Sequence, residues 1–120
     1  MRYDYKKQLK SFRFAWKGIR ACVGKEQNLD FHLLVMVLVI IAGMYFHITR
    51  TEWMVAVLCF GLVIGAELFN CAIERLADIA HPEWDERVGK VKDIAAGAVL
   101  ATAIAAAVVG LIIFVPYLIS

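Results

Sequence analysis

Three long stretches of this 120-residue chain are strongly apolar and carry no charged side chain; they cover residues 31–48, 53–66 and 94–120. The first, at a rise of ~1.5 Å per residue, reaches ~27 Å, close to the ~30 Å hydrocarbon core of a bilayer. Because 62% of the residues are apolar and the mean hydropathy is +0.69, the composition argues against an ordinary soluble domain. The pattern predicts an all-α integral membrane protein with three transmembrane helices.

The length fits one domain over residues 1–120. Within it we expect three membrane helices, over residues 31–48, 53–80 and 91–118. The second is expected to end before Pro82, which cannot continue a helix. Gly97 and Gly110 in the third span allow close approach between helices. We therefore expect association between chains.

Residues 4–23 predict an amphipathic helix that ends near Gly24. Aromatic and aliphatic side chains repeat every three or four residues, and lysines and arginines repeat at the same spacing on the other side. A basic face opposite an aromatic-rich apolar face is typical of a helix lying in the membrane interface. A solvated helix packed on a soluble core remains the alternative.

Lysine and arginine are distributed unequally among the segments outside the spans. They are abundant before residue 26 and between the second and third spans, whereas the first loop has only Arg50 and the C-terminus has none. By the positive-inside rule, the N-terminus and the second loop should face the cytoplasm.

The second apolar stretch runs into four polar residues: Glu67, Asn70, Glu74 and Asp78. Spacings of three, four and four place them on one face of a helix. Glu67 lies ~21 Å along the helix from Trp53, toward the cytoplasmic surface. A carboxylate at membrane depth is costly and marks a functional site by default. The alternatives are a solvated face for Glu74 and Asp78, and an interhelical hydrogen bond for Asn70.

These residues suit phosphoryl transfer. Glu67, in apolar surroundings, can accept a proton from a hydroxyl. Glu74 and Glu26, nearer to water, can bind Mg²⁺ together with phosphate oxygens. Lys92 begins a helix, where it can meet phosphate. The sequence contains no Walker A, HExxH or ExxH motif, which argues against the common soluble nucleotide-binding folds and di-iron bundles.

The cysteines and two of the histidines show no ligand pattern. Cys22, Cys59 and Cys71 form no CxxC or Cys/His motif, so we expect reduced residues packed in or beside apolar helices. His32 and His47, at the ends of the first span, are interpreted as interfacial residues rather than metal ligands.

Two segments, Glu67-Leu-Phe-Asn70-Cys-Ala-Ile-Glu74 and Lys92-Asp93-Ile-Ala-Ala-Gly97-Ala-Val-Leu, resemble the signature of the small bacterial diacylglycerol kinase and undecaprenol kinase family. The order of Trp16-Lys17-Gly18, Glu26 and three spans also matches, so the resemblance covers nearly the whole chain. It implies a homotrimeric, multi-pass lipid kinase of the bacterial inner (cytoplasmic) membrane. Active sites in this family form between subunits, and here they would lie on the cytoplasmic side.

The resemblance also implies roles for individual residues. Glu67 matches the family's general base, and Asn70 matches the asparagine that orders the reacting groups. Glu26 and Glu74 match the carboxylates that hold Mg²⁺ on the nucleotide. The remaining implied nucleotide contacts are Lys92, Asp93, Glu83, Asp85 and Lys7.

Three positions depart from the family pattern. Trp84 and Asp85 stand in the loop where Tyr and His are usual, and Cys71 stands where Ser or Thr is usual. A thiol is a weaker hydrogen-bond donor than a hydroxyl. Trp16, together with Glu67, is expected to contact the lipid.

The function expected from these residues is an ATP-dependent lipid kinase that uses MgATP and phosphorylates undecaprenol or diacylglycerol. The segments Asn28–Leu34, Thr51–Trp53 and Gly110–Pro116 look more like the undecaprenol kinase branch. We expect no nucleic-acid partner. A small proton-coupled transporter is the alternative, although three spans without an internal repeat do not suit it. A non-catalytic scaffold would not need the acidic face.

Overall fold

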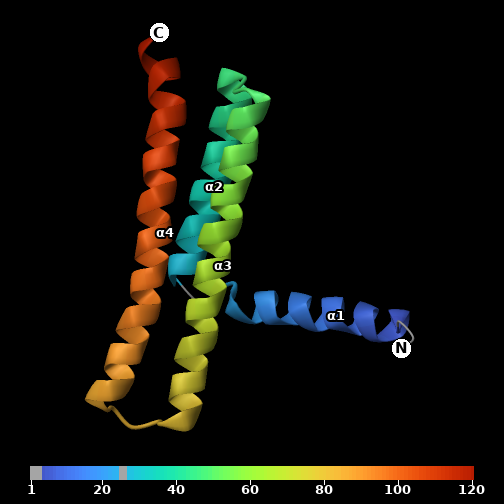
Figure 1. Ribbon diagram of the computed structural model, residues 1–120, viewed down its shortest axis with the longest axis vertical. Coiled ribbons are helices and arrows are strands. Elements are labelled where there is room, and N and C mark those ends of the chain that lie inside the picture. The colour runs from blue at the N-terminus through green and yellow to red at the C-terminus, as the bar shows by residue number, and fades with distance from the viewer. Residues whose placement is uncertain (1–3, 25–26) are drawn as a thin grey trace.

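The computed structural model describes residues 4–24 and 27–120, and all of their regular structure is helical (Figure 1). The helices are α1 (Tyr5–Cys22), α2 (Gln27–Phe46), α3 (Arg50–Ala80) and α4 (Glu86–Ile119). Helices α2, α3 and α4 lie side by side, and α1 runs crosswise away from the middle of this bundle.

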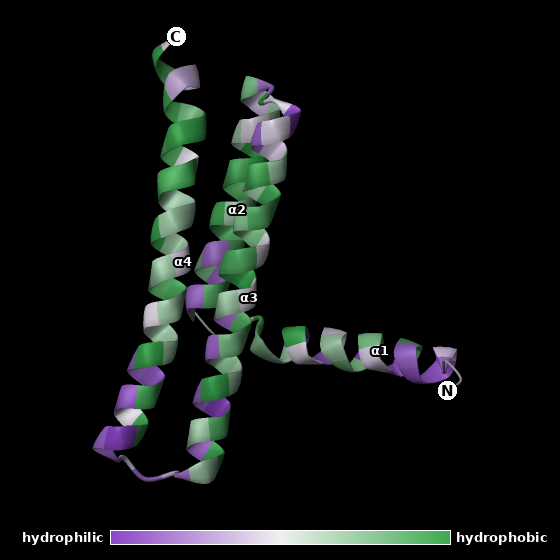
Figure 2. Cartoon of the chain, viewed as in Figure 1, coloured by the Kyte–Doolittle hydropathy of each residue, from purple (hydrophilic) through white to green (hydrophobic). Residues whose placement is uncertain are grey.

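The three helices of the bundle are long and apolar enough to cross a membrane. Figure 2 shows that apolar residues fill most of their length, whereas hydrophilic residues gather at the end formed by the last turns of α3 and the first turns of α4. We call this the polar end of the bundle. The prediction of an all-helical chain with three long apolar helices is confirmed.

Helices α3 and α4 begin three and five residues earlier than predicted, because polar side chains cap them outside the apolar runs. Thr49 and Glu52 form a capping box at α3, in which Thr49 Oγ1 accepts from Glu52 N–H at 3.2 Å and Glu52 Oε1 accepts from Thr49 N–H at 2.9 Å. Asp85 Oδ1 accepts from Arg87 N–H at 2.8 Å at the start of α4.

The turn between α2 and α3 is tight because His47 adopts a left-handed conformation, with φ of 52°. The N–H of Ile48 then donates to the carbonyl of Gly43 at 3.1 Å, which closes the end of α2 in a Schellman-type arrangement. Immediately beyond this turn, the Trp53 ring of α3 lies against Gly43, so the two helices approach closely.

Helix α4 packs mainly against α3. The buried side chains of the two helices include small residues, Ala56 and Ala95, which let the backbones come near each other. At the far end from the polar residues, Tyr117 of α4 donates a hydrogen bond to Glu52 Oε1 at 2.5 Å. This contact joins the C-terminal part of α4 to the start of α3.

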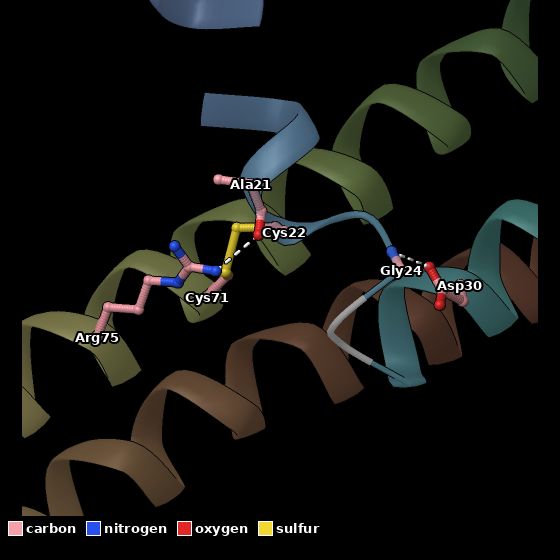
Figure 3. The surroundings of a disulfide bond; sticks show 6 residues. All are labelled: Ala21, Cys22, Gly24, Asp30, Cys71 and Arg75. Atoms are coloured by element: carbon pink, nitrogen blue, oxygen red, sulfur yellow. Dashed lines mark hydrogen bonds between the residues drawn. A yellow bond between two sulfur atoms is a disulfide. The ribbon is translucent and has the colours of Figure 1, made fainter. Parts of the chain in front are cut away.

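A disulfide bond between Cys22 and Cys71 ties the end of α1 to α3 (Figure 3). Arg75 Nη2 also donates to the carbonyl of Ala21 at 2.6 Å, and Gly24 N–H donates to Asp30 Oδ1 at 2.9 Å. The expectation of three reduced cysteines is therefore wrong for this pair, whereas Cys59 is free. The helix packing brings the two Cα atoms to 6.5 Å despite a separation of 49 residues.

Substitution of Gly43 by alanine should destabilise the α2–α3 contact. A Cβ atom there would lie 2.7 Å from Trp53 Cη2 and 3.1 Å from Ile48 Cδ1, and such overpacking costs about 1–3 kcal/mol. We expect a lower thermal unfolding midpoint in detergent micelles. Gly61→Ala is the matched control, because among the described residues nothing lies within 4 Å of its Cβ position. Equal midpoints for the two variants would contradict the contact.

The pairing of Cys22 with Cys71 predicts one intramolecular cross-link after mild oxidation of the purified protein. Peptide mapping without reductant should recover the two cysteines in a joined peptide and leave Cys59 open to alkylation. Cys22→Ser should abolish the cross-link, and Cys59→Ser should leave it unchanged. Recovery of Cys59 in the cross-link would contradict the arrangement.

Candidate active site

Glu67 is almost completely buried at the contact between α3 and α2. Its side chain is 2% exposed, and its Oε1 lies 3.2 Å from Nε2 of His32 on α2. An ionised carboxylate is unfavourable away from water unless a partner stabilises it. The imidazole of His32 is the polar group that the neighbouring helix brings next to this carboxylate.

Asn70 lies one turn beyond Glu67 on the same face of α3 and is 7% exposed. Within the described part of the chain, no donor reaches its Oδ1 atom. Buried side-chain oxygens in folded proteins nearly always have a hydrogen-bond partner. A ligand that enters beside Glu67 is therefore one way to complete this site.

An apolar groove of about 420 Å³ opens between α2, α3 and α4. It is lined by side chains such as Val35, Met36, Phe60 and Ile64, with alanines of α4 on the third side. His32, which lies 3.2 Å from Glu67, is one of the lining residues. The groove is therefore related to the buried carboxylate through His32, whereas Glu67 itself is not among the residues that line it.

The polar end of the bundle holds a second hollow, of about 220 Å³, lined by Asp78, Lys92 and residues 81–85 among others. Lys92 Nζ of α4 donates to Asp78 Oδ1 of α3 at 2.6 Å. Because Asp78 is 64% exposed, this ion pair adds little to stability. The cation of Lys92 therefore lies in a wet hollow where an anionic ligand can reach it.

Asp85 is engaged in the structure of the loop. Besides capping α4, its carboxylate accepts from the Arg87 side chain at 3.1 and 3.3 Å and lies 3.6 Å from His81 Nε2. The Arg87 side chain foremost, and then its backbone N–H, hold the pKa of Asp85 below its usual value. The same carboxylate is less available to a nucleotide, and its expected role in binding stays a prediction.

A single chain does not gather all the residues expected at the site. Glu67 and Asp78 are eleven residues apart on α3, or ~16 Å along the helix. Trp16 is 61% exposed on α1, which points away from the bundle, and Lys7 lies still further along α1. Asp93 is exposed beside Lys92. Glu26 lies outside the described residues.

Interpretation of the sequence alone missed two contacts of the site. His32 was interpreted as an interfacial residue, yet it touches Glu67. Asp78 was placed on the acidic face without a partner, yet it binds Lys92. No local pattern identifies either contact, because each joins two helices.

The donor chemistry at this end of the molecule suits Mg²⁺. Among residues 4–24 and 27–120, no three His, Cys, Asp or Glu side chains cluster as ligands. Mg²⁺ does not require such a cluster, since it commonly takes one or two carboxylates together with phosphate oxygens and water. The half-buried Glu74 carboxylate, one turn from the unsatisfied Asn70 Oδ1, offers oxygen ligands of the right kind.

Taken together, the fold and the site define a multi-pass helical membrane protein with an apolar groove and a buried carboxylate on the same bundle of helices. Residues 13–114 match the family described as prokaryotic diacylglycerol kinase. The chain is 34% identical over 117 residues to the undecaprenol kinase of Bacillus subtilis (strain 168). This match covers 98% of this chain and 95% of the relative.

A second relative is the diacylglycerol kinase of Synechocystis sp. (strain ATCC 27184 / PCC 6803 / Kazusa). It is 37% identical over 113 residues, covering 93% of this chain and 65% of the relative. The chain belongs to the prokaryotic diacylglycerol kinase family, whose members are lipid kinases. The resemblance seen in the sequence is thereby confirmed.

Proposed function

We propose that this protein transfers the γ-phosphoryl group of ATP to the hydroxyl of a membrane lipid at the cytoplasmic face of the bacterial inner membrane. The observation that carries the proposal is the position of Glu67, a buried carboxylate that lies against His32, one of the residues lining an apolar groove. A lipid chain suits the groove, and its hydroxyl would then lie beside the carboxylate.

In the proposed reaction, the lipid hydroxyl oxygen attacks the γ-phosphorus in line. The bond between that phosphorus and the bridging oxygen of ADP breaks, and the hydroxyl proton passes to Glu67. Asn70, with its unsatisfied Oδ1, helps to order the reacting groups. Lys92 neutralises negative charge on the phosphates, as a lysine does in other phosphoryl-transfer sites.

We further propose that Glu74 and Glu26 hold Mg²⁺ on the nucleotide. When bound, the ion supplies charge neutralisation on the β- and γ-phosphates. Asp93, Glu83, Asp85 and Lys7 are proposed nucleotide contacts.

We propose that the protein acts as a homotrimer. In one chain α1 carries Trp16 and Lys7 away from the carboxylates, so residues of neighbouring chains would complete each site. Many large apolar side chains of α2 and α4, such as Leu38, Tyr45 and Leu111, are exposed in the single chain. Neighbouring chains and lipid would cover these surfaces.

We propose undecaprenol as the preferred lipid and diacylglycerol as the second candidate. The relative named undecaprenol kinase is matched over 95% of its length. The transporter alternative has less support, because the acidic residues lie toward one end of the bundle and the family is one of kinases.

Phosphate transfer in mixed micelles tests the function. With γ-labelled ATP and Mg²⁺, label should appear in undecaprenyl phosphate when undecaprenol is offered beside diacylglycerol. Glu67→Gln should retain the fold and lose ~10²–10⁴-fold in rate, the usual contribution of a general base. Label mainly in phosphatidic acid would assign diacylglycerol instead, and wild-type rates in Glu67→Gln would remove the base from Glu67.

Lys92→Ala should weaken ATP use more than lipid use. The loss of a charge-assisted hydrogen bond costs about 1.5–3 kcal/mol, so the KM for ATP should rise ~10–100-fold. Lys90→Ala is the matched control, an exposed cation two residues away on α4, and it should leave the KM near wild type. Equal rises in the KM for ATP and for lipid would argue against a phosphate contact.

A further inference from the structure

The last turn of α1 is tied to the bundle beside the buried residues of α3. Residues 5–18 of α1 are exposed, whereas Cys22, the final residue of the helix, is buried and bonded to Cys71 of α3 (Figure 3). Arg75 donates to the carbonyl of Ala21 at the same junction. Opening of the disulfide would leave this junction to noncovalent contacts such as that hydrogen bond.

The disulfide belongs to a buried cluster that lies next to the candidate active site. Cys22 and Cys71 pack with Leu29 of α2, and Leu29 and Cys71 are each only 1% exposed. Cys71 lies four residues after Glu67, on the same face of α3. On α2, Leu29 lies three residues before His32, the residue that contacts Glu67. The disulfide therefore holds the end of α1 about one helical turn from the buried carboxylate.

We propose that Cys22 and Cys71 form a redox switch in which the disulfide closes access to Glu67 and the dithiol opens it. This inference rests on the proposed function, in which a lipid hydroxyl must come within hydrogen-bond reach of Glu67. In the disulfide form Glu67 is only 2% exposed, so the structure represents the closed state. Because most of α1 is exposed, its end can move with little loss of buried contacts once the sulfur atoms separate.

The cellular location in the proposed function makes a reversible disulfide informative. In the cytosol, glutathione and thioredoxin keep most thiols reduced, and the disulfides that do form there are usually transient and often sense redox state. At the cytoplasmic face, Cys22 and Cys71 would be thiols under ordinary conditions and the enzyme would be active. An oxidising shift would join them and close the site.

The oxidant in this proposal is a low-molecular-weight disulfide such as glutathione disulfide. The thiolate of Cys22, the more exposed of the pair, attacks one sulfur of the oxidant, forming a mixed disulfide and releasing one small thiol. The thiolate of Cys71 then attacks Cys22 Sγ and releases the second small thiol. Two cysteine thiols are oxidised, one small disulfide is reduced, and the two cysteine protons end on the released thiols.

Phosphate transfer to lipid tests the switch when wild-type protein in mixed micelles is equilibrated with glutathione disulfide or with dithiothreitol. Alkylation and mass spectrometry give the fraction of protein that carries the Cys22–Cys71 bond. We expect the disulfide form to be at least ~10-fold slower, because a disfavoured open state is populated to ~0.1–10%. Dithiothreitol should restore the rate.

Cysteine variants separate this bond from other effects of oxidation. Cys22→Ser and Cys71→Ser should each show equal rates under the two conditions, because neither can form the bond. Cys59→Ser, the matched control, should respond to oxidation as wild type does, since Cys59 is free. Each variant is compared with itself, so a change in its basal rate does not affect the result.

A second measurement follows access to Glu67 without requiring any kinase activity. Dicyclohexylcarbodiimide is an apolar reagent that adds to carboxyl groups, and peptide mapping locates the adduct. We expect Glu67 to be labelled at least ~10-fold more slowly in the disulfide form than in the dithiol form. Glu67→Gln serves as the blank for this position.

Several outcomes would overturn the switch. These are complete disulfide formation with unchanged rates of phosphate transfer and labelling, a faster enzyme in the disulfide form, and an oxidative loss that persists in Cys22→Ser. Redox-dependent labelling of Glu67 in a protein that phosphorylates no lipid would instead refute the proposed function and support the control of access, so the two failures are distinguishable.

Discussion

The arrangement of this protein depends on one constraint, which is that the hydrocarbon layer offers the peptide backbone no water to bond with. Helices α2, α3 and α4 satisfy their backbone N–H and C=O groups by hydrogen bonds within each helix. The connections between them are short: residues 47–49 join α2 to α3, and residues 81–85 join α3 to α4. Thr49 and Asp85 satisfy free N–H groups where helices begin. Apolar side chains can then point outward, toward lipid or toward other chains.

Within that apolar frame, the buried polar residues of α3 are energetically expensive. Glu67 and Asn70 lie away from water, where an apolar residue of similar volume would pack at lower cost. The His32 ring lies 3.2 Å from Glu67 Oε1, and among the described residues neither that oxygen nor Asn70 Oδ1 accepts a hydrogen bond. In the proposed function, a bound ligand would supply the missing partner.

The number and approximate extent of the membrane helices could be predicted, because hydropathy and helix length are properties of contiguous residues. The starts of α3 and α4 were predicted too late, since their first turns are polar and are held by the caps of Thr49 and Asp85. The end of α2 at Phe46 depends on the left-handed conformation of His47, a conformation that is uncommon for any residue other than glycine. The disulfide was missed because its two cysteines belong to different helices.

The sequence by itself determined the three apolar helices, the acidic face of α3 and the motifs that place the chain in its family, because each is written in neighbouring residues or in a helical period. Only the tertiary structure decided that His32 meets Glu67, that Asp78 meets Lys92 and that Cys22 meets Cys71. These partners are separated by between 14 and 49 positions along the chain. Their contacts arise from how helices cross and pack, and no local pattern of residues encodes that geometry.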